Sequence, residues 1–443
     1  MSQTRFDACV LGAGYAGLFA AHRLSLAGAT VLVVEAAPEV AGLMRSLPCP
    51  DEPGVQFDIG THFALLTGDA DIDVPLARLI PDDWIWFDGP LAEGHSFAGR
   101  LQPDTGCLDL TGHPDIARFQ ADFAAAPGDG DTAATLEARW VADFGPGLTR
   151  EILAPIARKH TGRDPADLAP GAMEVFAPPR LKLFSGPEVA ARKAADPAFD
   201  RRIAHIHRSI GATTIRKAYP RTGGVGAFVA AMATDIEARG GRVLAGAAPA
   251  FPDWTPGAPL TQIEVAGARY AFDRFVTGLA PAVVARSLGA TIPAAPFAAR
   301  DLALAHWLSD RPYATSALHW VTVYDPETPL SRVTLYANIA PGTPYRLTAE
   351  AAIGAGDPAP DPERLAADMA ARGLIDDPTH WRLVRTDRFR GAFPVLLPGW
   401  QGPMTAQAEA LAAQIPNLTA VGAAAGAPFG QLRLMRSITD ALG

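Results

Sequence analysis

Three glycines near the amino terminus, Gly12, Gly14 and Gly17, have the spacing of a turn that binds the pyrophosphate of a dinucleotide. The first glycine permits a tight turn, the second lets a pyrophosphate approach the backbone, and the third lets a helix pack closely on a strand. A helix that starts here offers unpaired N–H groups and the positive end of its dipole to phosphates. We therefore expect a phosphate site at this turn, with Tyr15 and Ala16 in the first helical turn.

A carboxylate follows the glycine turn at about the spacing of a ribose ligand. Glu35 stands at the end of the next expected strand, with Ala36 directly after it. Its carboxylate suits the ribose hydroxyls of a dinucleotide, and its charge argues against a 2′-phosphate. A glycine turn without a ligand is the alternative, and the strand and helix that flank the turn argue against it.

The elements around these residues read as a βαβ unit. Residues 6–11 form an apolar run typical of a buried strand, and 16–27 carry apolar residues at helical spacing up to Gly28. Residues 30–34 are apolar and β-branched, which predicts a second strand. A strand, a helix and a strand within about 30 residues imply a parallel sheet with a right-handed crossover.

The rest of the chain alternates between helical and strand-like stretches. Apolar spacing predicts helices at 114–125, 133–144, 147–160, 225–239 and 431–442, and strands at 242–245, 272–279, 320–324, 333–336 and 418–421. We predict an α/β fold in which a Rossmann-like nucleotide-binding domain is discontinuous and comprises 1–100, 216–290 and 381–443. A helical insertion at 101–215 and a sheet at 291–380 complete a mixed helical and β-sheet substrate domain. The ligand is expected between the two domains.

Composition excludes several other classes. The net charge of −9 disfavours a nucleic-acid partner, and no apolar run approaches the length of a membrane span. No secretory signal is evident, so we expect a cytoplasmic protein. Three cysteines without metal spacing, and a His205–His207 pair without further ligands, predict no metal site. The pattern leaves the oligomeric state open.

Further segments bear on which dinucleotide binds, because FAD and NAD share the glycine turn. Residues 42–46 and 57–62 (Phe-Asp-Ile-Gly-Thr-His) follow Glu35, and a second glycine turn at 426–430 precedes the last helix. At these segments the sequence resembles the flavoprotein superfamily of amine oxidases, protoporphyrinogen oxidases and UDP-galactopyranose mutases. The resemblance runs through most of the chain and is weakest between about 65 and 135.

The resemblance implies FAD as the cofactor. In that superfamily the first elements bind the ADP part and line the flavin, and the last helix points its amino terminus at the pyrimidine edge of the flavin. Besides the turn, Glu35 and Ala36, the positions it implies for the cofactor are Gly42, Leu43, Met44, Arg45, Gly60, Thr61, His62, Val243, Gly422, Gly430, Gln431 and Leu432.

Within the superfamily the pattern is most similar to the mutase branch. Residues 57–62 resemble its loop beside the isoalloxazine, 159–162 (Lys-His-Thr-Gly) resemble its lysine-bearing helix end, and 331–334 with Asn338 and Glu350 resemble its substrate-side strands. The arginines that hold a diphosphate in that branch correspond here to Arg332 and Arg180, and a guanidinium fork suits a phosphate. The candidate catalytic residues are therefore His62, Arg332 and Arg180.

The sequence also departs from the mutase pattern. Ala41 replaces the first of two expected glycines, and Phe393 stands where a tyrosine is expected before Pro394. Residues 431–434 (Gln-Leu-Arg-Leu) replace a tyrosine-rich segment. Because tyrosine hydroxyls help the mutases to hold their diphosphate, these changes argue against a UDP-sugar.

The candidate residues also have purely structural interpretations. His62 could be a hydrogen-bonded packing residue, Arg332 could pair with a strand carboxylate such as Glu350, and Lys159 could stabilise a helix carboxyl end. Trp84, Trp86 and Trp320 are more typical of a core or pocket wall than of catalysis.

The sequence favours an FAD-dependent oxidoreductase that transfers a hydride from a polar small molecule to flavin N5. A flavin-dependent nucleotide-sugar mutase without net redox change is the alternative, and a flavin-bearing binding protein is a third hypothesis. An anionic small molecule and a nucleotide sugar are both candidate substrates.

Overall fold

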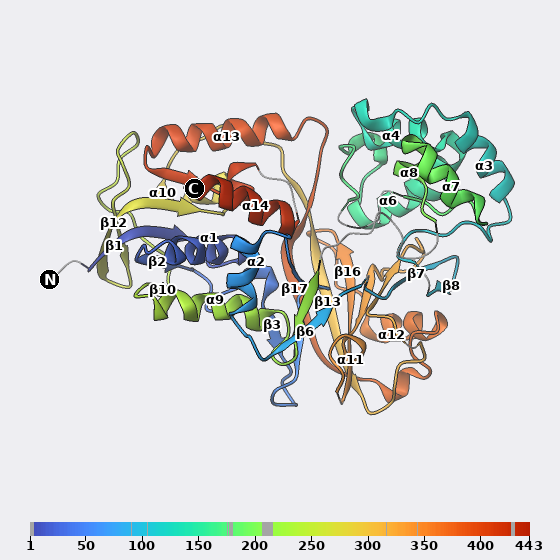
Figure 1. Cartoon of the computed structure of the whole chain (residues 1–443), viewed down its shortest axis with the longest axis horizontal. Helices are drawn as coiled ribbons and strands as arrows, with labels where there is room; N and C mark the ends of the chain where they lie inside the picture. The colour runs from blue at the N-terminus through green and yellow to red at the C-terminus, as the bar shows by residue number, and fades with distance from the viewer. Residues whose placement is uncertain are drawn as a thin grey trace.

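The chain folds into two lobes, each built on a β-sheet (Figure 1). The computed structural model describes residues 4–89, 91–103, 105–174, 176, 180–205, 216–315, 317–342, 344–426 and 430–443. In the described part no helix is long and apolar enough to cross a membrane.

The sheet of the first lobe has the strand order β10-β2-β1-β12-β11, with β18 also paired to β12. Its strands are β1 (Thr4–Leu11), β2 (Val31–Val34), β10 (Arg242–Leu244), β11 (Gln262–Val265), β12 (Ala268–Thr277) and β18 (Leu418–Ala420). All pairs are parallel except β11 with β12. The sheet thus draws on three separated parts of the chain.

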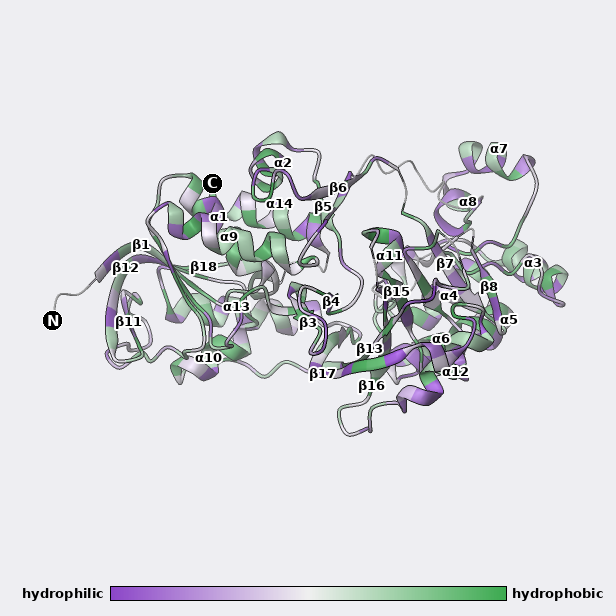
Figure 2. Ribbon diagram, turned by 90° about the horizontal axis from the view of Figure 1, so that it is seen from below, coloured by the Kyte–Doolittle hydropathy of each residue, from purple (hydrophilic) through white to green (hydrophobic). Residues whose placement is uncertain are grey.

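Helices cover both faces of this first sheet. The helices α1 (Tyr15–Leu26), α9 (Gly226–Ala238) and α14 (Gln431–Leu442) pack with Val10, Val33 and Val276 on one face. The helices α10 (Pro281–Leu288) and α13 (Gln401–Gln414) pack with Cys9 and Leu32 on the other. Figure 2 shows the helices α1 and α9 as largely hydrophobic. Central strands buried on both faces explain the unbroken apolar runs of β1 and β2.

The sheet of the second lobe has the strand order β17-β13-β16-β15-β14-β7-β8. These strands are β7 (Glu93–Phe97), β8 (Arg100–Gln102), β13 (Ala298–Ser309), β14 (Trp320–Val323), β15 (Arg332–Leu335), β16 (Tyr345–Ile353) and β17 (Arg382–Val395). The strands β7 and β17 fall within the ranges 1–100 and 381–443, which the sequence predicts to be part of the nucleotide-binding domain. They lie here because β17 pairs along β13 and β7 pairs with β14, and such distant pairings leave no local sequence signal.

The two faces of the second sheet differ in polarity. On one face Val321, Val333 and Leu347 form an apolar core with the helix α12 (Pro362–Ala371). Because side chains alternate along a strand, Arg332 and Glu350, which are direct partners in the register, share the opposite face. This opposite face of β15 and β16 is polar and is called the polar sheet face below.

A helical unit lies beside the second sheet, at the upper right of Figure 1. It contains α3 (Ile116–Ala125), α4 (Leu136–Phe144), α5 (Pro146–Leu148), a π-helical turn (Thr149–Leu153), α6 (Ala154–Thr161), α7 (Glu188–Ala195) and α8 (Pro197–Arg202). Its own core includes Phe119, Phe123, Phe144 and Phe199. The helices expected at 114–125, 133–144 and 147–160 are confirmed, with the last one divided.

Short strands connect the lobes. The pair β3 (Ser46–Pro48) and β4 (Gln56–Asp58) is antiparallel, and β5 (Ala64–Leu65), β6 (Trp84–Phe87) and β9 (Lys217–Pro220) form a three-stranded sheet. The helix α2 (Ala70–Ala77) lies between β5 and β6. The loop that carries His62 runs between β4 and β5, and so joins these two small sheets.

Candidate cofactor and substrate site

The glycine turn between β1 and α1 is as compact as its spacing predicts. Gly12 has a positive φ of 94° and donates its N–H to the carbonyl of Val34 at 2.8 Å. A Cβ at Gly17 would lie 1.9 Å from the carbonyl oxygen of Gly12, a separation that no pair of unbonded atoms tolerates. Gly17 is therefore required for the helix to start this close to the strand.

Gly14 has a different role, because it leaves space. It is the N-cap of α1, with no side-chain cap, and the first helical turn carries no acidic residue. No atom lies within 4 Å of the position that a Cβ at Gly14 would take. The first N–H groups of α1 lack partners within the helix, so an anion could approach them here. Ala16 is half-buried in that first turn, whereas the Tyr15 side chain is buried and its hydroxyl contacts the sulfur of Met435.

Glu35 faces the glycine turn. Its carboxylate accepts hydrogen bonds from the backbone N–H of Ala13 at 2.7 Å and of Ala37 at 2.8 Å. Val243 lies on the neighbouring β10, paired with Val33, and Ala36 is exposed. The carboxyl ends of β1, β2 and β10 thus meet beside the turn, at the edge where open parallel sheets bind their ligands.

Residues 41–45 pack over the same turn. Ala41 donates its N–H to the carbonyl of Ala13 at 2.8 Å, and a Cβ at Gly42 would lie 3.1 Å from the Cα of Gly14. Met44 is buried and Leu43 is exposed. The guanidinium of Arg45 bonds the carbonyl of Gly42 at 2.9 Å and lies over the ring of Phe389 in β17. This segment therefore joins the turn to the second lobe.

Asp58 anchors the start of the His62 loop. Its buried carboxylate accepts hydrogen bonds from Ser46 (2.6 Å), Tyr219 (2.7 Å) and the backbone N–H of Val225 (3.0 Å). Burial raises the pKa of Asp58, and the three hydrogen bonds oppose that shift. Because these partners come from three segments, Asp58 fixes where the loop leaves β4.

The loop then meets the polar sheet face. The hydroxyl of Thr61 pairs with that of Thr334 and lies 3.3 Å from an oxygen of Glu350. A Cβ at Gly60 would lie 3.6 Å from both the carboxylate of Glu350 and the Nε2 of His62. The loop of Gly60, Thr61 and His62 is therefore in contact with β15 and β16.

His62 is half-buried on this loop. Its pKa is lowered to about 4, chiefly by burial and then by the positive charge of Arg332, while a hydrogen bond to the carbonyl of Ile59 opposes the shift. The imidazole is consequently neutral near pH 7. One ring nitrogen donates to Ile59 and the other keeps its lone pair.

Arg332 is paired. Its Nε lies 3.3 Å from Glu350, whose side chain is only 1% exposed. The structural interpretation of Arg332 as the partner of Glu350 is therefore observed. The pair still belongs to the polar sheet face opposite the His62 loop, because Glu350 contacts Thr61.

Arg180 belongs to the helical unit and bonds other residues there. Its guanidinium lies 3.3 Å from Asp200 and 3.3 Å from the carbonyl of Arg201. Arg180 and Arg332 therefore have separate carboxylate partners on separate elements. The two arginines do not form a preassembled pair of free guanidiniums that faces one diphosphate.

Lys159 is held at the end of β14. Its ammonium donates to the carbonyls of Val323 at 2.6 Å and Asp325 at 2.9 Å. Burial lowers its pKa to about 7, against the nearby charge of Asp325. The lysine thus joins α6 to the sheet instead of only ending a helix.

The start of α14 is tied to the loop after His62. The side-chain amide of Gln431 donates to the carbonyl of Phe63 at 2.8 Å and accepts from the N–H of Leu65 at 3.1 Å. Gly430 precedes it with a φ of 111°. The rest of the expected second glycine turn, 427–429, lies outside the described residues.

Close packing at Gly422 brings the α14 region to α1. A Cβ at Gly422 would lie 2.7 Å from Leu434 and 3.5 Å from the Cβ of Ala16. A Cβ at Gly278, which follows β12, would lie even closer to the Cβ of Ala16, at 3.0 Å. The sequence analysis missed Gly278, although its place directly after a parallel strand was a usable signal.

A pocket of about 830 Å³ opens at the start of α14, between the first lobe and the helical unit. It is lined by Gly430, Gln431 and Leu432, by Trp400 of the loop after β17, and by Glu174 of the helical unit. Glu174 lies 3.8 Å from Arg139. A largely apolar wall with few polar groups is typical of a small-molecule site. Trp400 and Glu174 are not among the positions that the sequence predicts, and no local signal marks them. Thr334 lies in the segment 331–334 that the resemblance indicates, and it shares a strand face with Arg332.

No group of histidine, cysteine, aspartate and glutamate in the described ranges could hold a metal ion. His207 of the pair noted in the sequence lies outside the described residues, so the pair itself is not placed.

Comparison with known proteins supports the fold. The profile of the NAD(P)-binding Rossmann-like domain matches residues 10–72. No curated protein matches the chain by sequence. The crystal structure of a reduced UDP-galactopyranose mutase is similar, with a TM-score of 0.69 and 15% identity over 99% of this chain and 92% of that one.

Two oxidases are also similar in structure. A triple mutant of putrescine oxidase has a TM-score of 0.63 at 14% identity, covering 100% of this chain and 98% of that one. Cyclohexylamine oxidase from Brevibacterium oxydans IH-35A has a TM-score of 0.61 at 14% identity, covering 99% and 98%. At these identities the likeness establishes a shared fold over the whole chain.

Proposed function

We propose that this protein is an FAD-dependent oxidoreductase that transfers a hydride from a polar small molecule to flavin N5. The observation that carries the proposal is that three features of the fold are joined by direct contacts through Gly42, Met44 and Phe63. These features are the open amino terminus of α1 at Gly14, the loop of His62, and the start of α14 at Gln431.

The residues present fit FAD. Open space at Gly14 and the uncapped first turn of α1 suit the pyrophosphate, and the carboxylate of Glu35 at the end of β2 suits ribose hydroxyls. Gly60, Met44 and the start of α14 would face the isoalloxazine end. The bound cofactor would supply a hydride acceptor at N5, and the protein would supply orientation and electrostatics.

The chain's own residues set the chemistry on the substrate side. The neutral imidazole of His62 keeps one lone pair, so it can accept a hydrogen bond or a proton from a substrate O–H or N–H. The pair of Arg332 and Glu350 offers donors and an acceptor with no net charge. That pair favours a polar substrate over a diphosphate, which would need free positive charge.

A nucleotide-sugar mutase is the second candidate. The observation in its favour is that an arginine, Arg332, stands on the polar sheet face opposite the His62 loop, as the resemblance to the mutases implies. Against it, Glu350 already neutralises Arg332, and Arg180 is held by Asp200.

The first experiment concerns the cofactor. The purified protein is expected to be yellow and to release FAD on acid treatment. Gly14→Asp is expected to abolish FAD binding without unfolding the protein, because the new carboxylate fits sterically but occupies and repels the pyrophosphate position. A colourless protein that cannot be loaded with FAD would overturn the proposal.

The second experiment separates the two reactions. An oxidoreductase starts with oxidised flavin, so anaerobic addition of its substrate bleaches the flavin absorbance. A mutase needs its flavin reduced and has no net redox change. Dithionite-reduced protein that isomerises a nucleotide sugar, with no bleaching of the oxidised protein by any of a panel of amines, alcohols and hydroxy acids, would establish the mutase instead.

A further inference from the structure

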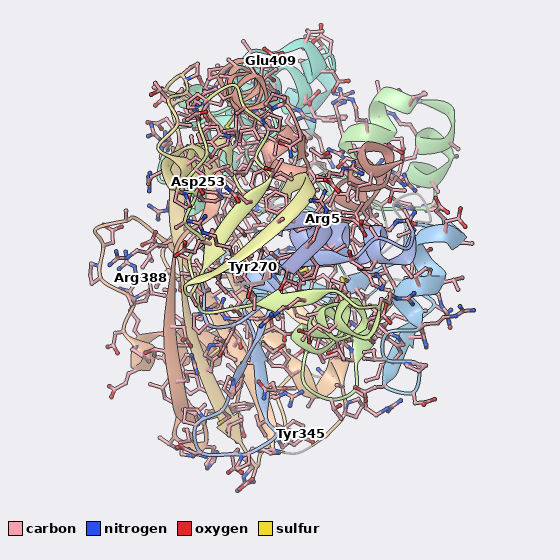
Figure 3. The ribbon with its side chains drawn as sticks, turned by 90° about the vertical axis from the view of Figure 1, so that its left-hand side faces the viewer. Arg5, Asp253, Tyr270, Tyr345, Arg388 and Glu409 are labelled. Carbon is pink, nitrogen blue, oxygen red and sulfur yellow. The ribbon has the colours of Figure 1, made fainter. Side chains whose placement is uncertain are left out.

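A second large pocket, of about 940 Å³, opens where the end of α6, the start of β13 and the last part of β17 meet. It shares no lining residue with the pocket at the start of α14. The long strands β13 and β17 lie side by side in Figure 1, and Figure 3 labels Arg388, a residue of β17, near the outer margin of this sheet. We call it the edge pocket, and neither the cofactor residues nor the polar sheet face contributes to it.

The edge pocket is strongly basic. Three arginines, Arg163, Arg300 and Arg390, line it, and Asp301 is its single acidic lining residue. Asp301 is already neutralised, because Arg388 binds it at 2.7 Å and the N–H of Gly391 donates to it at 2.9 Å. A concentration of positive charge is unexpected in a chain with a net charge of −9, and it favours an anionic ligand.

Arg300 forms part of the pocket wall and has unused hydrogen-bonding capacity. One terminal nitrogen of its guanidinium donates a hydrogen bond to the carbonyl of Ala352 at 2.7 Å. The other terminal nitrogen packs against Gly162, where an added Cβ would lie only 2.7 Å from it. Within the described residues its Nε is buried and has no hydrogen-bond partner. A buried donor without a partner is costly and often marks the place of a ligand.

The other two arginines stand at the rim. Arg163 and Arg390 are exposed, and their guanidiniums make no hydrogen bond or ion pair with any described residue. Arg388 provides a contrast on the same strand, since its guanidinium is fully engaged by Asp301 and by the carbonyls of Gly354 and Asp357. The two rim arginines are thus available to a ligand, whereas Arg388 has a structural role.

One exposed aromatic ring completes the pocket. Phe297 is 71% exposed, more than any other large hydrophobic residue described, and it lines the edge pocket beside Arg300. An exposed phenyl ring offers a face on which a nucleobase can stack. Arginine forks beside it suit phosphate oxygens.

We propose that the edge pocket binds a nucleoside polyphosphate, with Arg163, Arg300 and Arg390 on the phosphates and Phe297 on the base. The site is separate from the flavin and substrate site, so the ligand is an effector or a second substrate. The proposal does not depend on the reaction proposed above, because none of its residues touches that site.

The test is titration calorimetry with ADP and, separately, with inorganic pyrophosphate. The titrations use the protein saturated with FAD, so that FAD keeps ADP out of the glycine turn. They are repeated with the Gly14→Asp variant, whose carboxylate keeps ADP out of the turn even if FAD does not bind there. ADP is expected to bind, and Arg163→Ala and Arg390→Ala are each expected to weaken it by about tenfold through loss of a charge-assisted contact. Phe297→Ala is expected to weaken ADP but not pyrophosphate.

The controls remove positive charge elsewhere. Arg286→Ala removes another exposed arginine, on α10, and Arg332→Ala removes the arginine of the polar sheet face. Both are expected to leave ADP affinity unchanged. The proposal is overturned if ADP does not bind at low salt, if Arg286→Ala or Arg332→Ala weakens ADP as much as Arg390→Ala does, or if Phe297→Ala leaves ADP affinity unchanged.

Discussion

The glycine turn and the polar sheet face build their sites in opposite ways. The turn relies on missing side chains, since Gly17 must have no Cβ and Gly14 leaves open space at a helix terminus. The polar sheet face relies on side chains that already bind one another, such as Arg332 with Glu350 and Thr61 with Thr334. The first site should therefore be damaged by adding atoms and the second by removing them.

Adding one methyl group to the turn gives the largest expected effect. Gly17→Ala places a Cβ 1.9 Å from the carbonyl oxygen of Gly12, so α1 must move away from β1. We expect a loss of at least ~3 kcal/mol in the free energy of unfolding and a loss of bound FAD. Urea denaturation and flavin absorbance measure the two effects.

The matched control for that variant is Gly14→Ala. Its Cβ would meet no atom within 4 Å, and its φ of −70° suits alanine. Its free energy of unfolding should stay within about 1 kcal/mol of the wild type, while FAD occupancy falls because the methyl group occupies space next to the helix terminus. Equal destabilisation by the two variants would remove the distinction between the two glycines.

Removing atoms from the polar sheet face is expected to have the next largest effect. Arg332→Ala leaves the buried carboxylate of Glu350 without its cation, which should cost about 2–3 kcal/mol in the free energy of unfolding. The double variant with Glu350→Gln should recover part of that loss. Arg382→Ala, which breaks only exposed pairs with Asp51 and Glu52, should cost less than about 1 kcal/mol.

The same face predicts a pH dependence. The folded protein keeps His62 neutral down to a pKa of about 4, whereas the ordinary value is 6.5. Between these values the unfolded chain binds a proton that the folded one does not, so the stability contribution of this group is lost as the pH falls from 6.5 to 4. His62→Gln should therefore lose less stability than the wild type over this range in urea denaturation.

An exposed histidine serves as the control for this pH effect. His380→Gln should follow the wild-type curve across the same pH range. If the His62→Gln and wild-type curves run parallel, then His62 is not held neutral in the folded protein, and its assignment as the hydrogen-bond acceptor for the substrate fails.

The smallest expected effect concerns Ala41, which replaces a glycine expected beside the turn. Its φ of 74° lies in the left-handed region, which is unfavourable for alanine. Ala41→Gly should relieve this strain and raise the free energy of unfolding by up to ~1 kcal/mol. Ala20→Gly, in the middle of α1, should instead lower it by about 1 kcal/mol. Thermal denaturation distinguishes the two directions.

The nucleotide-binding end of the fold was largely predictable because its signals are local. The turn at 12–17, the helix after it and the strand ending at Glu35 lie within one βαβ unit, and the structure has all of them. Backbone sterics and helix termini act over a few residues, so residue type and spacing suffice to identify them. The resemblance further indicated the loop of residues 60–62, whose contact with Glu350 of β16 the structure shows.

The second lobe could be predicted only in part. The pairing of β17 with β13 and of β7 with β14 joins segments far apart in the sequence, and no local pattern specifies such pairings. The register that sets Arg332 opposite Glu350 also decided that this arginine is neutralised. From the sequence alone, Arg332 could equally bind a substrate diphosphate or pair with a carboxylate of a neighbouring strand.

The sequence by itself therefore determined that a dinucleotide-type turn exists, where its helix begins and which carboxylate follows it. The tertiary structure alone decided that α14 reaches the His62 loop through Gln431, that Arg180 and Arg332 have different partners, and that three arginines meet at the edge pocket. The physical reason is range. Steric limits at a glycine act between neighbours in the chain, whereas charge compensation and pocket formation depend on which distant residues the two sheets bring together.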